Sequence, residues 1–271
     1  MDHHDLGTKD GNLLLFGGPY SNLQALDALL AVARARGIAG PEMICTGDVV
    51  AYCGDPEATV ARIVDTGAVV VAGNCEVQLG EGAQDCGCGF EAGTACDLLS
   101  AGWFGFANAR VGAGARAWMR RLPGIVTFQH HGARYAVIHG GVTDIARFIF
   151  ATTAEAALSA EWDAVEARVG PVDHIMAGHS GIPFVRETPR GRWINAGVIG
   201  MPPHDGTPQT RYATLSEGAV ELHALHYDAG AAATRMRAVG LTQGYDRALL
   251  TGYWPSEEVL PSALRRVSDS G

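Results

Sequence analysis

The chain has 271 residues and a formal net charge of −9, with 47% hydrophobic and 18% charged residues. This length can bury a core of its own, and the balance of apolar and charged residues excludes a disordered protein. No run of Lys or Arg offers the basic surface that bulk nucleic acid would need. No stretch reaches the roughly 20 apolar residues of a membrane span, and the acidic start at Asp2 does not resemble a secretory signal. We therefore expect a cytoplasmic protein without a nucleic-acid or membrane partner.

Glycine and cysteine are the most informative minor residues. Glycine accounts for 36 of the 271 residues, about 13%, against an ordinary usage of about 7%. This surplus predicts many tight turns, or backbone that approaches another group closely. Six cysteines in a cytoplasmic chain of this length are expected to be thiols or metal ligands before disulfides.

Strands and helices alternate along the first part of the chain. The apolar run 13–16, bounded by glycine, predicts a buried strand, and residues 21–36 repeat apolar side chains at helical spacing. A second strand is expected at 43–45, a helix at 58–65 and a third strand at 69–72. Such alternation predicts a layered α/β core with helices packed on a sheet.

Residues 76–109 interrupt this order as an excursion from the core, with a Gly- and Cys-rich loop at 79–93 and a helix at 96–107. A further helix is expected at 154–169. The remaining strands are short and are expected at 125–128, 135–139, 174–177, 182–186, 192–195, 212–216 and 219–225. Two helical patches, 234–239 and 256–267, end the chain. With no repeat and no long linker, we expect residues 1–271 to form a single domain.

Polar residues lie at or just beyond the ends of four of the expected strands. They are Asp48, Asn74, His139 and His179. In α/β folds ligands bind beyond the carboxyl ends of the strands, so these side chains are expected to lie together. Carboxylate, amide and imidazole groups all bind divalent metals. One such residue is usually a cap or a turn residue, but four in succession predict a metal site.

The order and spacing of these motifs resemble the calcineurin-like metallophosphoesterases, particularly their small bacterial phosphodiesterase branch. The resemblance runs from about residue 13 to about residue 212. Its landmarks are residues 21–26, Gly47-Asp48, Gly54-Asp55-Pro56, Gly73-Asn74-Cys75-Glu76, His139-Gly140, Gly178-His179 and residues 193–197. It implies an α/β fold, a four-layer α/β/β/α sandwich of the metallophosphoesterase type, with a metal centre where two sheets meet.

Two motifs depart from the family pattern. The D-x-H that normally ends the first strand is replaced by Gly18-Pro19-Tyr20, and the second His of G-H-x-H is replaced by Gly181. The resemblance assigns these lost side chains to a first metal site. The ligand set that it implies for a second site is complete: Asp48, Asn74, His139 and His179. We therefore expect a remodelled centre with one divalent transition-metal ion (manganese, iron, zinc or nickel).

The resemblance implies a hydrolase that cleaves a small phosphoester, either a monoester or a diester, with Asp48, Asn74 and Cys75 as catalytic residues and the excursion as a lid. Its partner would be a small phosphorylated molecule, and homo-oligomerisation stays open. The alternative is a catalytically inactive binding or regulatory protein with the same fold. The lost D-x-H favours that alternative, whereas the complete second ligand set favours the hydrolase.

Four further residues each have two interpretations. Tyr20 either replaces a lost ligand or fills volume, and His204 either turns toward the first site or caps a turn. Thr143 and Asp144 follow His139 and either face substrate or cap the next helix. His130 is expected to be an exposed turn residue, and the histidines near the N-terminus are expected to be flexible.

The cysteines also allow more than one role. Cys75 stands where many relatives have a histidine that protonates the leaving group, so the thiol is an acid, a ligand or a bystander. Cys86, Cys88 and Cys96, together with Cys75 or Cys53, would supply thiolates for another metal site, but the C-x-C spacing is not the usual zinc spacing. Free buried thiols are the default expectation.

Overall fold

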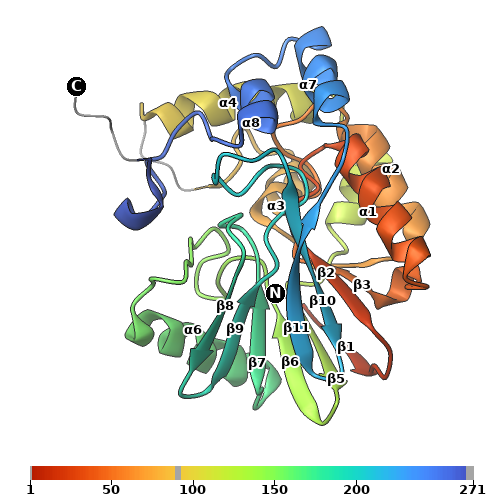
Figure 1. Cartoon of the computed structure of the whole chain (residues 1–271), viewed down its shortest axis with the longest axis vertical. Coiled ribbons are helices and arrows are strands. Elements are labelled where there is room, and N and C mark those ends of the chain that lie inside the picture. The colour runs from red at the N-terminus through yellow and green to blue at the C-terminus, as the bar shows by residue number, and fades with distance from the viewer. Residues whose placement is uncertain (1, 89–92, 267–271) are drawn as a thin grey trace.

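Two β-sheets packed face to face form the centre of the molecule, and helices cover their outer faces (Figure 1). The structure is a computed structural model and describes residues 2–88 and 93–266. This arrangement confirms the α/β/β/α sandwich expected from the sequence.

The five-stranded sheet has the order β11-β10-β2-β3-β4. Its parallel part consists of β2 (Leu13–Phe16), β3 (Met43–Cys45) and β4 (Val69–Val70). Two antiparallel strands, β10 (Thr210–Ser216) and β11 (Ala219–Leu225), complete it beside β2. The strands 13–16, 43–45 and 219–225 have the bounds that the sequence predicts.

The six-stranded sheet has the order β1-β5-β6-β7-β9-β8. Its strands are β1 (His3–Thr8), β5 (Ile125–His130), β6 (Ala133–Val137), β7 (His174–Ala177), β8 (Phe184–Thr188) and β9 (Gly191–Asn195). The expectation that the histidines near the N-terminus are flexible is wrong, because β1 runs parallel to β5 and His3 Nε2 lies 2.8 Å from the hydroxyl of Thr127. His130, expected to be exposed, is the fully buried last residue of β5.

The alternation of side chains along β2 shows how the layers form. Leu13 and Leu15 point between the two sheets, while Leu14 and Phe16 point toward the helices, because successive side chains of a strand face opposite ways. All four are buried. Burial of each contributes on the order of 1.5–3 kcal/mol, so β2 stabilises two layers at once.

Helices close both outer faces. On the five-stranded sheet lie α1 (Leu23–Ala35) and α2 (Pro56–Thr66), and on the six-stranded sheet lies α6 (Glu155–Val169) (Figure 1). Asn22 caps α1 by accepting a hydrogen bond from the amide of Ala25 at 3.1 Å. The other helices are α3 (Asn74–Glu81), α4 (Ala95–Asn108), α5 (Ala113–Met119), α7 (Ala229–Ala238) and α8 (Tyr245–Thr251), with short 3₁₀ turns at Gly40–Glu42 and Ser262–Leu264. No helix within the described ranges is long and apolar enough to cross a membrane.

The C-terminal part differs most from the sequence expectation. The expected helix at 256–267 is absent over its described residues, where there is only the 3₁₀ turn Ser262–Leu264; residue 267 lies outside the described residues. Pro261 explains this difference, since proline inside a helix removes a hydrogen bond and clashes with the preceding turn. Within the excursion, α3 extends to Glu81, and residues 89–92 of the expected loop lie outside the described part of the chain.

Candidate metal centre

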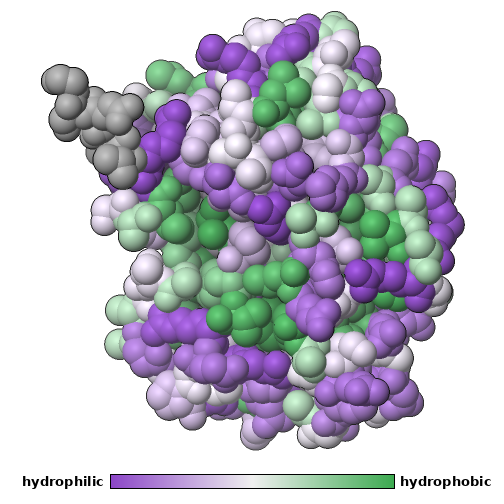
Figure 2. Space-filling view, in the orientation of Figure 1, coloured by the Kyte–Doolittle hydropathy of each residue, from purple (hydrophilic) through white to green (hydrophobic). Residues whose placement is uncertain are grey.

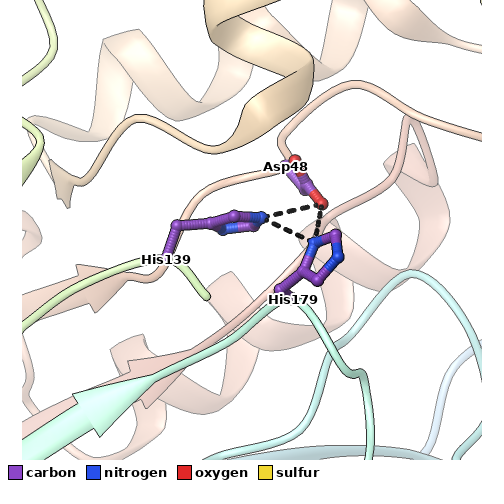
Figure 3. Close-up of side chains that lie close together, drawn as sticks. All are labelled: Asp48, His139 and His179. Atoms are coloured by element: carbon purple, nitrogen blue, oxygen red, sulfur yellow. Dashed lines mark hydrogen bonds and ion pairs between the residues drawn. The ribbon is translucent and has the colours of Figure 1, made fainter. Parts of the chain in front are cut away.

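Each sheet supplies two of the four residues that the sequence groups together. Asp48 follows β3 and Asn74 follows β4 in the five-stranded sheet, while His139 follows β6 and His179 follows β7 in the six-stranded sheet. All four are buried. Figure 3 shows the side chains of Asp48, His139 and His179 pointing toward one another.

The ring nitrogen Nε2 of His139 lies at the centre of the group. It is 3.3 Å from Asp48 Oδ2, 3.0 Å from Asn74 Oδ1 and 3.1 Å from His179 Nδ1. Asp48 Oδ2 and His179 Nδ1 are 3.9 Å apart. Donor atoms of Asp48, His139 and His179 thus all lie within 4.8 Å of one another, close enough to share one ion.

Hydrogen bonds outside the group decide which atoms face inward. His139 Nδ1 lies 2.6 Å from the carbonyl of Thr46, and because a carbonyl only accepts, Nδ1 donates; in the neutral ring Nε2 then has the lone pair. Asn74 donates through Nδ2 to the carbonyl of Cys86 at 2.8 Å, which directs Oδ1 inward. Lone pairs of a carboxylate, an amide and an imidazole therefore converge, an arrangement that fits a divalent cation.

Electrostatics agree with this arrangement. Burial alone would lower the pKa of His139, but the effect of the Asp48 carboxylate is larger, so the pKa of His139 lies above its ordinary value. Burial likewise raises the pKa of Asp48, yet His139 and His179 bring it below the ordinary value. Burial and the charge of His139 lower the pKa of His179 to about 3. Asp48 thus remains ionised and favours a positive charge on or beside His139. On binding, a metal ion would replace the proton of His139.

Glu76 positions two of the ligands. It is fully buried, and its carboxylate accepts hydrogen bonds from the amides of Asp48 at 2.7 Å, Val49 at 2.8 Å and Gly73 at 3.0 Å. These bonds join the turn after β3 to the turn after β4. Burial and the charge of Asp48 raise the pKa of Glu76 to about 7. In the sequence, Glu76 stands in the Gly73-Asn74-Cys75-Glu76 motif without an assigned role, and its position two residues after Asn74 is the available signal.

Backbone geometry around the ligands is unusual. Asp48 has φ 57° and His179 has φ 59°, in the left-handed region that residues other than glycine rarely adopt. Gly73 allows the close approach, since a Cβ at this position would overlap both Asp48 Oδ1 and the Asp48 amide. Residues other than glycine with this backbone conformation are concentrated at functional sites, where the surrounding structure holds them in place.

Aromatic rings lie against both glycines that replace ligands of the family pattern. A Cβ on Gly18 would overlap the ring of Tyr20, which is buried and packs edge-on against Tyr52 with centroids 4.8 Å apart. A Cβ on Gly181 would lie 3.4 Å from Trp254 Cζ2. Tyr20 and Trp254 thus fill space beside the positions where the family pattern has an aspartate and a histidine.

A cavity of about 50 Å³ adjoins His179. Its walls are largely aromatic and include Tyr20, Tyr52, Phe148, His179, Tyr245 and Trp254. The ring of Phe148 packs against that of His179 with centroids 4.4 Å apart. Figure 2 shows a band of hydrophobic residues across the middle of this face, between the part with α4 and α8 and the part with β8 and β9.

His204 belongs to a contact with the C-terminal segment. Its Nδ1 accepts a hydrogen bond from the amide of Trp254 at 2.9 Å, so Nε2 carries the proton and donates to Glu257 Oε1 at 3.0 Å. The Trp254 indole donates to the carbonyl of Pro202 at 2.7 Å. These bonds hold Trp254 against Gly181, and they leave neither nitrogen of His204 free to bind a metal.

Thr143 is bound by Glu161 of α6, and Asp144 is engaged within its own loop. The amide of Thr143 lies 3.2 Å from Glu161 Oε2, and its hydroxyl donates to Glu161 Oε1. Asp144 accepts a hydrogen bond from the amide of Ala146 at 3.0 Å. Both residues therefore shape the turn after His139.

The cysteines have different environments. Cys75 is a buried free thiol whose amide donates to Asp48 Oδ1 at 3.3 Å, and burial together with the charge of Asp48 raises its pKa, so it remains protonated. Cys86 and Cys88, expected as free thiols, are instead joined in a disulfide. The C-x-C spacing brings the two sulfurs together, so they pair with each other. Cys96 is free, and its sulfur lies 3.4 Å from the hydroxyl of Ser256.

Comparison with solved structures assigns the class of fold. A metallophosphoesterase from Sphaerobacter thermophilus is 18% identical, with 90% of this chain and 100% of that chain covered and a TM-score of 0.68. A hypothetical protein from Pyrococcus horikoshii OT3 is 16% identical, with coverage of 90% and 99% and a TM-score of 0.71. A putative diadenosine tetraphosphatase is 15% identical, with coverage of 83% and 98% and a TM-score of 0.52. The fold is thus that of the metallophosphoesterases.

The sequence establishes the family itself. The model of the calcineurin-like phosphoesterase superfamily domain matches residues 20–219, and the chain belongs to this superfamily of metal-dependent hydrolases. Comparison with curated proteins gives no match.

Proposed function

We propose that this protein is a phosphoesterase with one catalytic divalent transition-metal ion, held by Asp48, Asn74, His139 and His179, and that it hydrolyses a small phosphoester. The convergence of lone pairs on His139 Nε2 carries this proposal. Without a metal ion or a proton on His139, three acceptor atoms would lie buried within about hydrogen-bond distance of one another, at a cost in free energy.

The absence of a first metal site is supported by packing as well as by lost ligands. A Cβ on Gly18 would overlap the ring of Tyr20, so restoring the family side chain there would require this ring to move, and the Cβ position of Gly181 lies in van der Waals contact with Trp254. We accordingly assign the chain to a branch of the superfamily with a degenerate first site.

The ligands, Cys75 and the aromatic cavity have different roles in the proposed reaction. When bound, the ion would polarise the phosphoryl group and acidify the attacking water. His139 is oriented by Thr46, and Asn74 by Cys86, so the ligands are fixed before substrate arrives. Cys75 keeps its proton beside Asp48 and in the proposal donates it to the leaving group. The aromatic cavity beside His179 excludes water from the reacting groups.

We also propose that residues 1–271 act as one domain and that the excursion at 76–109 covers the site. Its helix α4 packs into the core through Trp103 and Phe104, and Cys96 at its start lines the cavity. The excursion is therefore packed against the core of the domain.

The second candidate is a catalytically inactive binding or regulatory protein that retains one metal ion. The loss of all three side chains of the first site favours it, because two-metal centres clamp the attacking and leaving oxygens together and a single ion does not.

Metal analysis and hydrolysis of a panel of phosphomonoesters and phosphodiesters test the proposal. We expect one ion per chain and turnover of at least one substrate, both lost in Asp48→Asn. Asp163→Asn is the matched control, since Asp163 lies on the surface in an ion pair with Arg190, and it should retain both. Unchanged activity in Asp48→Asn would refute the site, and one tightly bound ion without turnover would favour the binding protein.

A further inference from the structure

Three sulfur atoms lie near the side-chain amide of Asn74, one ligand of the proposed metal centre. Asn74 Nδ2 lies 2.8 Å from the carbonyl of Cys86, 3.3 Å from Cys88 Sγ and 3.7 Å from Cys75 Sγ. Cys86 and Cys88 form a disulfide across the single residue Gly87, and both are buried. The amide group of a proposed metal ligand is thus oriented by the loop that the disulfide closes.

The contact with this loop decides which atom of Asn74 faces the metal centre. A side-chain amide has an acceptor at one end and a donor at the other, and rotation by half a turn exchanges them. Donation from Nδ2 to Cys86 leaves Oδ1 at 3.0 Å from His139 Nε2. If the Cys86 carbonyl moved, this preference would weaken, and an N–H would face the metal position in part of the molecules.

The local backbone makes the loop dependent on its cross-link. Gly87 has φ 64°, in the left-handed region that favours glycine, and its Cβ position faces the side chain of Gln78. Its amide donates to Asp85 Oδ1 at 2.8 Å. Glycine has the largest conformational freedom of any residue, so the ring closed by Cys86 and Cys88 restricts a segment that would otherwise sample many conformations.

The short ring also argues against a purely stabilising role. A disulfide stabilises a fold chiefly by restricting the unfolded chain, and this effect grows with the length of the closed loop. A loop with one residue between its cysteines gains the least from it. We therefore expect this disulfide to act on the conformation of its own loop, and the site residue in contact with that loop is Asn74.

We propose that Cys86 and Cys88 are a redox modification site that sets the metal affinity of the centre through Asn74. In the oxidised form the sulfur–sulfur bond fixes the Cys86 carbonyl and hence Asn74 Oδ1. In reduction a dithiol delivers two electrons and two protons, the bond breaks to two thiols, and the dithiol becomes a disulfide. The reduced loop is released, and Asn74 loses its fixed partner.

The expected effect is a loss of metal affinity by a factor of about 10–100, the usual result of removing a group that orients a metal ligand. Asn74 acts here as a ligand, so the inference rests on the proposed function, whereas the disulfide itself does not. Cys86 and Cys88 are positioning residues, since they reach the metal centre through Asn74.

The experiment compares oxidised and reduced full-length protein after removal of the reagent under argon. Alkylation and mass spectrometry count free thiols, and competition with a chromogenic chelator measures zinc and manganese affinity. We expect two fewer thiols in the oxidised form, assigned to the peptide with Cys86 and Cys88, and at least tenfold tighter metal binding. The double variant Cys86→Ser/Cys88→Ser should bind metal as weakly as the reduced form, and oxidant should not change its metal affinity.

Cys53→Ser is the matched control. Cys53 is a buried free thiol outside the disulfide, and its sulfur lies 3.8 Å from the carbonyl of Gly200, so this variant should retain the difference between the two forms. Equal metal affinity in both forms, or no disulfide after oxidation, would overturn the inference and leave the proposed function intact. Metal binding in neither form would overturn the proposed function and the coupling with it. Because wild-type protein supplies both forms, the outcome does not depend on whether the serine variant folds.

Discussion

At the scale of single residues, the side chains that replace the first metal site are as informative as those that form the second. Gly18 has φ 24°, and the ring of Tyr20 folds back over it. Tyr20 itself has φ 52°. The loss of an aspartate and the gain of an aromatic ring are therefore linked, because the ring needs the space that a side chain at position 18 would take.

We expect Gly18→Ala to lower the free energy of unfolding, by about 1–3 kcal/mol for the forced overlap with Tyr20. The cost should shrink when Tyr20→Ala is already present, since the ring that the new methyl group meets is gone. Urea unfolding of the two single variants and the double variant gives the coupling energy. Gly37→Ala controls for backbone strain alone, because Gly37 has φ 66° with open space around its Cβ position. A cost for Gly18→Ala that is independent of Tyr20 would contradict this arrangement.

Glu76 makes a second prediction at this scale. Glu76→Gln keeps the size of the side chain but places an NH₂ group against amides that now donate to a carboxylate. We expect metal affinity to fall by a factor of about 10–100, because the turns that carry Asp48 and Asn74 lose their common anchor. Chelator competition measures it. Glu81→Gln, exposed at the end of the same helix, should be neutral, and equal affinities in the two variants would refute the anchoring role.

At the scale of elements, the sequence predicts best the parts that pack in a regular way. The strand at 13–16 could be predicted because all its side chains are apolar, and the helix at 154–169 because it carries Leu158, Trp162 and Val165 inward. The short α5 and α8 were missed, since seven residues give too little periodicity. The four ligands could be predicted because each follows a strand, but the roles of Glu76 and His204 depend on contacts between distant segments.

The C-terminal segment around Trp254 is held by a titratable contact. Burial places the pKa of His204 below its ordinary value, despite the opposing effect of Glu257, and Asp205 and Arg266 also act on it. The unfolded chain therefore takes up a proton on His204 at a higher pH than the folded chain. The stability that this contact contributes is present above the ordinary histidine pKa of about 6.5 and is lost as the pH falls through the lower pKa of the folded state.

We expect the amide of Trp254 to exchange with solvent faster at pH 5 than at pH 7, after correction for intrinsic exchange, because protonated Nδ1 cannot accept its hydrogen bond. Hydrogen exchange with mass spectrometry of a peptide that contains Trp254 measures this. In His204→Ala exchange should be fast at both values. His131→Ala, at an exposed histidine, should leave the pH response unchanged. An unchanged response in His204→Ala would show that another group controls the segment.

At the scale of the whole molecule, the proposed ion would join the two sheets. Asp48 and Asn74 extend from one sheet, and His139 and His179 extend from the other. Between the sheets lies an apolar layer that includes Leu15, Phe128 and Met176. Non-directional contacts hold this layer together, whereas the ligands meet at one edge of it with directed lone pairs.

We therefore expect metal removal to destabilise the entire fold. An ion that binds only the native state adds about 2.7 kcal/mol at a free concentration of 100 times Kd. Calorimetry of chelator-treated and reloaded protein should show a Tm several degrees higher with metal. Asp48→Asn should lose this increment and Asp163→Asn should keep it. Asp48 is the one anionic ligand of the proposed set, so Asp48→Asn leaves only neutral ligands around the positive ion. An equal increase in Tm in Asp48→Asn would therefore show that the stabilising ion binds elsewhere.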